Sequence, residues 1–194
     1  PYHAQQLGIS MVPQELYIVP HLNGVENIFL GKLKKNDLGF VNWKYLKTKA
    51  KELIKLLGWE IDLNVPVKQL TVPETQVIQI ARALSSDPKI LIFDEPTSML
   101  GDKDIEGLFR VINILKQRGI GIIYISHRLA EIFSISERVT VLRDGKVVHG
   151  SYTEDIEVEE VIELMLGKSL KESYPEKNEN IGDPILEVVN LRKK

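Results

Sequence analysis

Two short apolar segments with an amphipathic segment between them constrain the fold most. Residues 89–93 and 121–125 are predominantly apolar, and their length and lack of alternation predict strands that are buried on both faces. Residues 102–118 carry apolar side chains at helical spacing and stop before a glycine, so they predict a helix. The order strand, helix, strand predicts a parallel sheet of the α/β class.

The segments on either side extend this pattern. A strand is expected at residues 9–12, and a helix followed by a further strand of the α/β pattern at residues 128–136 and 138–142. Asp144-Gly145 predicts a hairpin turn into residues 146–149. Further helices are expected at residues 23–30, 42–57, 74–85 and 157–166.

These elements divide the chain into five parts. We expect the core to begin in residues 1–21, a helical subdomain to be inserted at residues 22–88, and the α/β core to continue through residues 89–167. Residues 168–184 are rich in Glu, Lys, Asn, Ser and Pro and predict a linker. Another strand-like run follows in residues 185–194.

Composition excludes several classes of protein. The 194 residues include no cysteine, which excludes a disulfide scaffold, a thiolate nucleophile and cysteine-bound zinc. The net charge of −2 provides no general attraction for nucleic acid, and the lysines of residues 42–57 are interpreted as a solvated helix face. The longest apolar run, residues 90–93, is too short to span a bilayer, and no signal-peptide pattern opens the chain. Both ends are interpreted as cut from a longer protein.

Polar side chains stand at the carboxyl ends of two predicted strands. Asp94 and Glu95 follow the first strand, and His127 follows the next one. Open α/β sheets bind ligands at this edge, although paired acids can also cap a turn and a single histidine is often structural. Ser126 and His127 do not form a hydrolase pair, because the chain has no G-x-S-x-G sequence.

Four motifs follow one another along the chain, namely Gln14, Leu70-Thr71-Val72-Pro73-Glu74, Asp94-Glu95-Pro96-Thr97 and Ile125-Ser126-His127. Their order and spacing resemble those of the nucleotide-binding subunit of an ATP-binding cassette (ABC) transporter. Residues 14–16, 26–31, 124–128 and 166–175 more narrowly resemble the first cassette of the tandem ribose/galactose/xylose-type sugar importers. The resemblance implies a P-loop NTPase-type parallel core with an inserted helical subdomain, and a second cassette that begins in residues 185–194.

The resemblance also implies a role for each motif, with ATP and Mg²⁺ as cofactors. Gln14 would contact Mg²⁺ or the attacking water and couple the site to a permease. Asp94 would hold Mg²⁺ through water, and Glu95 would be the general base or the residue that orients the water. His127 would contact the γ-phosphate. The signature residues Thr71, Pro73 and Glu74 would meet a nucleotide, and the D-loop residues Gly101 and Asp102 would face the partner cassette.

The function that the resemblance implies is ATP hydrolysis that powers sugar import. The implied partners are membrane permease subunits, a second cassette and, indirectly, a sugar-binding protein outside the membrane, with no nucleic acid. The subunit would lie in the cytoplasm, at the inner face of the membrane. A non-catalytic coupling cassette remains an alternative. A DNA-associated ABC ATPase is disfavoured, because the residues between Gln14 and Leu70 leave no room for a long coiled coil.

The chain departs from the family pattern in its phosphate-binding loop. The sequence G-x-x-x-x-G-K-[ST], known as Walker A, is missing, since neither Gly31-Lys32 nor Gly167-Lys168-Ser169 fits it. The family places this loop upstream of Tyr2. We therefore expect a core that is incomplete at its N-terminal side, with exposed sheet edges, and a chain that does not hold ATP tightly by itself.

The signature is the second departure. Pro73 lacks a backbone N–H, and Glu74 adds a negative charge where a γ-phosphate would lie, so the sequence predicts a weakened signature. Thr71 and Glu74 also fit a capping box at the start of a helix, which is the interpretation that we favour for the local geometry.

Overall fold

The computed structural model describes residues 2–35 and 39–167, together with the single residues 186, 189 and 192. They form two compact units, divided between Ser136 and Glu137, and each unit is described by itself. The predicted linker at residues 168–184 lies outside the described residues, as does most of the predicted start of a second cassette. None of the helices in the described ranges is long and apolar enough to cross a bilayer.

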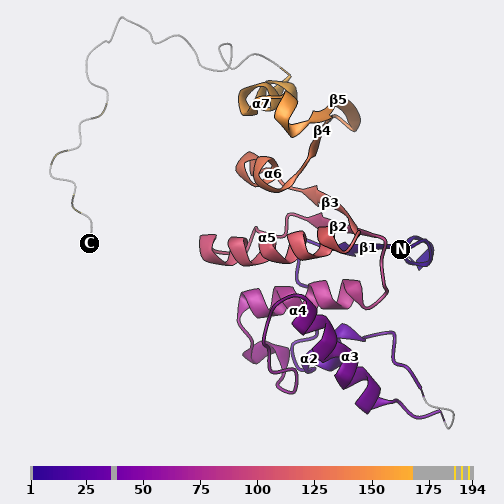
Figure 1. Cartoon of the computed structure of the whole chain (residues 1–194). Helices are drawn as coiled ribbons and strands as arrows, with labels where there is room; N and C mark the ends of the chain where they lie inside the picture. Colours follow the sequence, from indigo (N-terminus) through magenta and orange to yellow (C-terminus); the bar gives the residue numbers. More distant parts are fainter. Residues whose placement is uncertain (1, 36–38, 168–185, 187–188, 190–191, 193–194) are drawn as a thin grey trace, which may run out of the picture. The chain divides into compact units, whose positions relative to one another are not determined.

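A three-stranded parallel sheet organises the first unit (Figure 1). Its strands are β1 (Ile9–Val12), β2 (Ile90–Asp94) and β3 (Gly121–Ile125), in the spatial order β1-β2-β3. β2 lies in the middle and pairs in parallel with both neighbours. The three strands occupy the predicted positions within one residue, and their carboxyl ends lie at the same edge of the sheet.

One face of the sheet is buried by helices. Leu91 and Phe93 of β2 are fully buried, and helix α5 (Asp102–Gln117) adds Ile112 and Leu115 to the same hydrophobic core. On the other face Met11, Ile123 and Ile125 are about half exposed, at 48%, 50% and 45%. The prediction of strands buried on both faces is therefore correct for one face only within the described residues. No further described strand pairs with the outer edge of β1 or β3.

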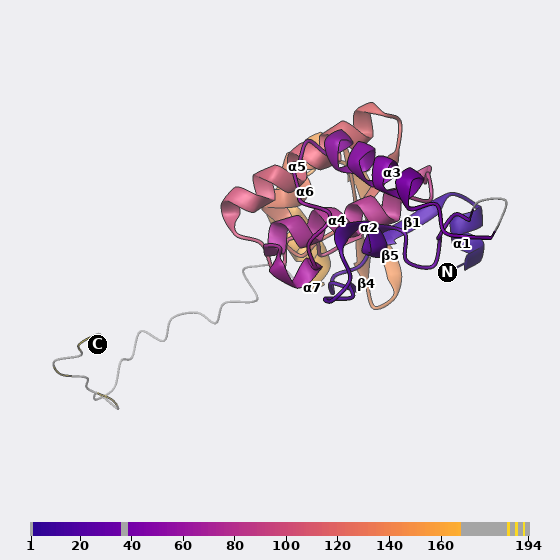
Figure 2. The ribbon, with the colours of Figure 1, turned by 90° about the horizontal axis from the view of Figure 1, so that it is seen from below.

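The inserted helices pack together, as the view from below shows (Figure 2). They are α2 (Gly24–Ile28), α3 (Trp43–Leu56) and α4 (Val72–Leu84), and a 3-10 turn, η1 (Val67–Gln69), precedes α4. α4 contacts α2, α3 and β1, so it joins the helical group to the sheet. It begins two residues before the predicted range of 74–85, because Thr71 is its N-cap, as the predicted capping box requires, and a proline occupies its first turn.

Helix α1 (Tyr2–Gln6) was not expected from the sequence. It has five residues and none of them is buried, so it carries no amphipathic pattern that could predict a helix. The last helix of the first unit, α6 (Leu129–Ile135), follows β3 as predicted.

The second unit contains β4 (Arg138–Arg143), β5 (Lys146–Tyr152), the 3-10 turn η2 (Thr153–Asp155) and α7 (Val158–Leu166). β4 and β5 form their own two-stranded antiparallel sheet, so the expectation that β4 continues the parallel pattern is wrong. The predicted hairpin turn is confirmed: Asp144 and Gly145 both have positive φ, of 52° and 75°, and this turn pairs β4 with β5 rather than with a strand of the parallel sheet.

Asn27 anchors the loop between β1 and α2. Its side chain is fully buried, and its Oδ1 accepts a hydrogen bond from the backbone N–H of Val19 at 2.9 Å. Its Nδ2 donates to the carbonyl oxygens of Val19, Leu22 and Asn23, each at 3.1 Å. One buried amide thus ties three residues of the loop to the start of α2.

We expect Asn27→Ala to lower the free energy of unfolding by about 3 kcal/mol, because the loop loses its hydrogen bonds to this buried amide. Denaturant titration measures this through the fluorescence of Trp43 and Trp59, which are the two tryptophans of the chain. Gln6→Ala removes an exposed amide and should leave the midpoint unchanged. An equal midpoint for Asn27→Ala and Gln6→Ala would contradict the anchoring role.

Candidate active site

Three sequence-predicted residues meet at the carboxyl edge of the parallel sheet. Gln14 follows β1, Glu95 follows β2 and His127 follows β3. Gln14 Nε2 donates a hydrogen bond to Glu95 Oε2 at 3.0 Å, and His127 Nδ1 lies 3.2 Å from Glu95 Oε1. Each oxygen of the central carboxylate is therefore engaged by a residue from a neighbouring strand.

The group is open to solvent. The side chain of Glu95 is 30% exposed and that of His127 is 67% exposed. A carboxylate in this position accepts hydrogen bonds and remains accessible to a water molecule, so its geometry suits a group that removes or holds a proton.

The backbone of Glu95 adopts an uncommon conformation. Its φ is 44°, in the left-handed region, where a side chain other than glycine costs on the order of 1 kcal/mol. Its N–H donates to the carbonyl oxygen of Ile125 at 2.9 Å, which ties this turn to the end of β3. The turn at the end of β2 is thus fixed by the adjacent strand.

Helix α4 holds the loop that carries Gln14. Nε2 of the buried Gln79 donates to the carbonyl oxygens of Pro13 and Glu15, at 3.1 and 3.2 Å. Arg82 Nη1 donates to the carbonyl oxygen of Tyr17 at 2.8 Å. The carbonyls on both sides of Gln14 are therefore fixed to a helix of the inserted group.

The predicted signature residues form a capping box at the start of α4. Glu74 Oε2 accepts hydrogen bonds from the Thr71 N–H and the Thr71 hydroxyl, each at 2.8 Å, and the Thr71 Oγ1 accepts from the Glu74 N–H at 3.4 Å. The local prediction of a capping box is confirmed. In the described part of the chain, no hydrogen bond or ion pair links Thr71, Pro73 or Glu74 to Glu95.

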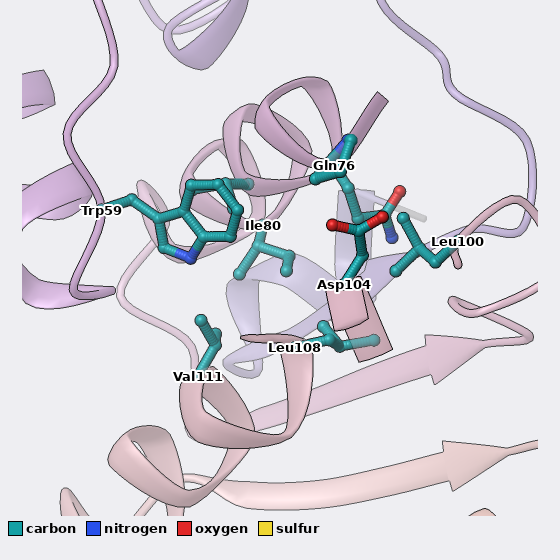
Figure 3. A pocket seen from close by; sticks show the side chains of 9 residues that line it. Trp59, Gln76, Ile80, Leu100, Asp104, Leu108 and Val111 are labelled. Atoms are coloured by element: carbon teal, nitrogen blue, oxygen red, sulfur yellow. The ribbon is translucent and has the colours of Figure 1, made fainter. Parts of the chain in front are cut away.

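A pocket lies between α4 and α5 (Figure 3). Its lining is mostly apolar and includes Trp59, Pro73, Leu100 and Leu108, with the carboxylate of Asp104 beside them. Leu100 and Asp104 of the lining flank the predicted D-loop residues, of which Gly101 is the N-cap of α5 and Asp102 is its exposed first residue. The signature segment and the D-loop segment therefore border one pocket.

The residues predicted to bind Mg²⁺ supply only part of a coordination sphere. Asp94 is the last residue of β2 and directly precedes Glu95, whose carboxylate is hydrogen-bonded to Gln14. Across the described residues no group of three or more His, Cys, Asp or Glu side chains could hold a metal. These few oxygen donors fit Mg²⁺, because the ion usually keeps several water ligands and takes others from substrate phosphates.

A fourth residue near the site, Glu131 of α6, has no motif in the sequence that marks it. Its carboxylate is 6% exposed and accepts hydrogen bonds from Thr97, Tyr124, Ser126 and Arg128. Burial raises the pKa of the Glu131 carboxyl, but these hydrogen bonds outweigh burial and leave the pKa below its ordinary value. Burial and the hydrogen bond to Glu131 raise the pKa of Tyr124 far above its ordinary value, so this hydroxyl stays protonated.

Comparisons with known sequences give a family match. The sequence profile described as ABC transporter matches residues 2–98. The ribose import ATP-binding proteins RbsA of Streptococcus agalactiae and Bacillus licheniformis are each 44% identical to the chain, over 191 and 194 residues. These alignments cover 98% and 100% of this chain but only 39% of each relative, so the chain spans well under half the length of the curated relatives that it matches.

Solved structures share the fold. A dimeric post-hydrolysis state of an ATP-binding cassette bound to ADP and Pi has a TM-score of 0.63 and 26% identity, over 75% of this chain and 62% of that chain. The ADP conformation of a cassette from an ABC transporter has a TM-score of 0.68 over 87% of this chain and 72% of that chain, and at 18% identity it shows the fold alone. The predicted class, a P-loop NTPase-type parallel core with an inserted helical group, is confirmed.

The lowered pKa of Glu131 predicts a pH-dependent contribution to stability. The ionised carboxylate stabilises the fold above the ordinary pKa of 4.5, and this contribution is lost as the pH falls through the lower folded-state value. We expect the difference in denaturant midpoint between the wild type and Glu131→Gln to shrink as the pH is lowered below 4.5. Glu60→Gln makes the same chemical change at an exposed loop position and is the control at pH 7, where it should leave the denaturant midpoint unchanged. A difference that stays constant from pH 7 to pH 3 would contradict this assignment.

Proposed function

Because this chain belongs to the ABC transporter family, we propose that it is part of the ATP-hydrolysing subunit of a sugar importer. The single observation that supports this most is the Glu95 carboxylate, which lies between Gln14 and His127 at the carboxyl edge of the sheet. The relatives' names favour ribose as the transported sugar.

In the proposed reaction the chain's own residues position a water molecule against the γ-phosphate of ATP. Glu95 accepts the proton of this water, and the hydrogen bond from Gln14 keeps the carboxylate turned toward the sheet edge. His127 lies on the other side of Glu95, where its imidazole would contact the γ-phosphate. Asp94 and Gln14 would hold Mg²⁺, whose charge stabilises the phosphate oxygens in the transition state.

The inserted helices would connect hydrolysis to a membrane permease. The segment that follows Gln14 is fixed to α4 through Gln79 and Arg82, and it exposes the side chain of Tyr17. A movement of Gln14 on hydrolysis would therefore be transmitted to α4 and to this exposed segment. We propose that the permease docks here, on the cytoplasmic face of the membrane, with a sugar-binding protein on the far side.

A second cassette is the other proposed partner. Gly101 and Asp102 are exposed at the start of α5, as a D-loop that faces a partner requires. Thr71, Pro73 and Glu74 begin a different helix and would meet the nucleotide of that partner in a head-to-tail dimer. One solved relative of this fold is dimeric, which supports the arrangement.

We expect Glu95→Gln to lower the rate of ATP hydrolysis by about 10²- to 10⁴-fold, because the amide cannot accept the proton of water. The measurement is single-turnover hydrolysis by the full-length protein assembled with its permease. ATP binding should stay within a few-fold of wild type, since the amide keeps the size of the side chain. A non-catalytic coupling cassette would lose no hydrolysis on this change, and that result would reject the proposed role of Glu95.

We expect Pro73→Gly to raise the ATPase rate of the full-length protein, because it restores a backbone N–H where a γ-phosphate of the partner site would bind. The steady-state rate is compared at saturating ATP. Val72→Gly, one position earlier in the same turn, controls for the loss of helix stability caused by glycine. An unchanged rate for Pro73→Gly would contradict a weakened signature.

A further inference from the structure

The carboxylate of Glu131 connects two loops that follow neighbouring strands. Its Oε2 accepts hydrogen bonds from Thr97 Oγ1 at 3.0 Å, from the Tyr124 hydroxyl at 2.8 Å and from Ser126 Oγ at 3.0 Å. Its Oε1 accepts from Arg128 Nη1 at 3.2 Å. Thr97 belongs to the loop after β2, whereas the other three donors belong to β3 or the loop after it.

These two loops carry the residues that flank the reacting centre. Thr97 lies two positions after Glu95, and Ser126 directly precedes His127. Both Thr97, at 2% exposure, and Glu131, at 6%, are shielded from solvent, so their hydrogen bond does not compete with water. The loop that carries Glu95 and the loop that carries His127 are thus both hydrogen-bonded to one atom, Oε2 of Glu131.

An ion pair between Glu131 and Arg128 alone would be a common feature of a helix surface and would contribute little to the stability of the fold. The arrangement differs from that, because three neutral hydroxyl groups converge on one buried oxygen. A buried charge is costly unless several donors satisfy it, so each donor is held where the carboxylate needs it. The Ser126 hydroxyl also accepts a hydrogen bond from the Arg128 N–H at 3.0 Å, which fixes the backbone on the far side of His127.

We propose that Glu131 is a positioning residue for hydrolysis, which sets the separation of Glu95 and His127 by holding the loops after β2 and β3 together. The inference rests on the proposed function. Small displacements of reacting groups lower enzymatic rates strongly, by as much as about 10²-fold for 1 Å. Glu131 itself contacts neither Glu95 nor His127 through a hydrogen bond in the described residues, so it acts through Thr97 and Ser126.

The test uses the full-length protein assembled with its permease. Glu131→Gln keeps the size of the side chain but puts an NH₂ group among donors, so we expect kcat to fall about 10- to 100-fold while KM for ATP stays within about threefold. Glu60→Gln makes the same chemical change at an exposed position and should keep the wild-type kcat. If Glu131→Gln does not fold, Thr97→Val and Ser126→Ala each remove one hydroxyl and should each lower kcat.

Two further comparisons separate positioning from general stability. Thr97→Ser retains the hydroxyl and should keep most of the wild-type kcat, whereas Thr97→Val should not. In a His127→Ala background, Glu131→Gln should lower the residual rate much less than it does in the wild type, because the residue being positioned is already absent.

The outcomes distinguish this inference from the function on which it rests. If the wild-type assembly hydrolyses no ATP, the proposed function fails. If the wild type is active and Glu131→Gln retains its kcat, or if Glu131→Gln lowers the rate by the same factor with and without His127, the proposed role of Glu131 is overturned while the function stands.

Discussion

The parallel pairing of β1, β2 and β3 is the constraint on which the site depends. Because all three strands run in the same direction, the loops that follow them leave the sheet at one edge. Gln14 and His127, which are distant from Glu95 in the sequence, thereby each come within hydrogen-bond distance of its carboxylate. If any one of the three strands ran in the opposite direction, the loop that follows it would lie at the far edge of the sheet, and its residue would be separated from the other two.

Two buried polar side chains, Gln79 and Glu131, then hold the loops that carry Gln14, Glu95 and His127 in place. Gln79 binds the backbone on both sides of Gln14 from α4, and Glu131 binds the loops of Glu95 and His127 from α6. Neither is a reacting group: Gln79 binds backbone carbonyls, and Glu131 binds three neutral hydroxyls and the guanidinium of Arg128. The accessible carboxylate of Glu95 is therefore surrounded by loops whose positions are determined by buried hydrogen bonds.

Much of this arrangement could be predicted from the sequence, because it follows from local patterns. The apolar runs and the residues after them placed β2, β3, Glu95 and His127, and the capping pair Thr71–Glu74 marked the start of α4. The hairpin of β4 and β5 could also be predicted, from Asp144-Gly145, but its separation from the parallel sheet could not, because pairing between strands distant in the sequence leaves no local pattern. Glu131 was missed for a similar reason: on its own helix it looks like an ordinary acid in the first turn, and its donors lie on other segments.

The central claim is that Gln14, Glu95 and His127 form one site around the γ-phosphate of ATP. The most direct measurement is a structure of the full-length protein with Mg²⁺ and a non-hydrolysable ATP analogue. The account predicts that the Glu95 carboxylate lies one water molecule away from the γ-phosphate, with Gln14 and His127 on either side. A bound analogue whose γ-phosphate is remote from Glu95, with the three side chains separated, would contradict it.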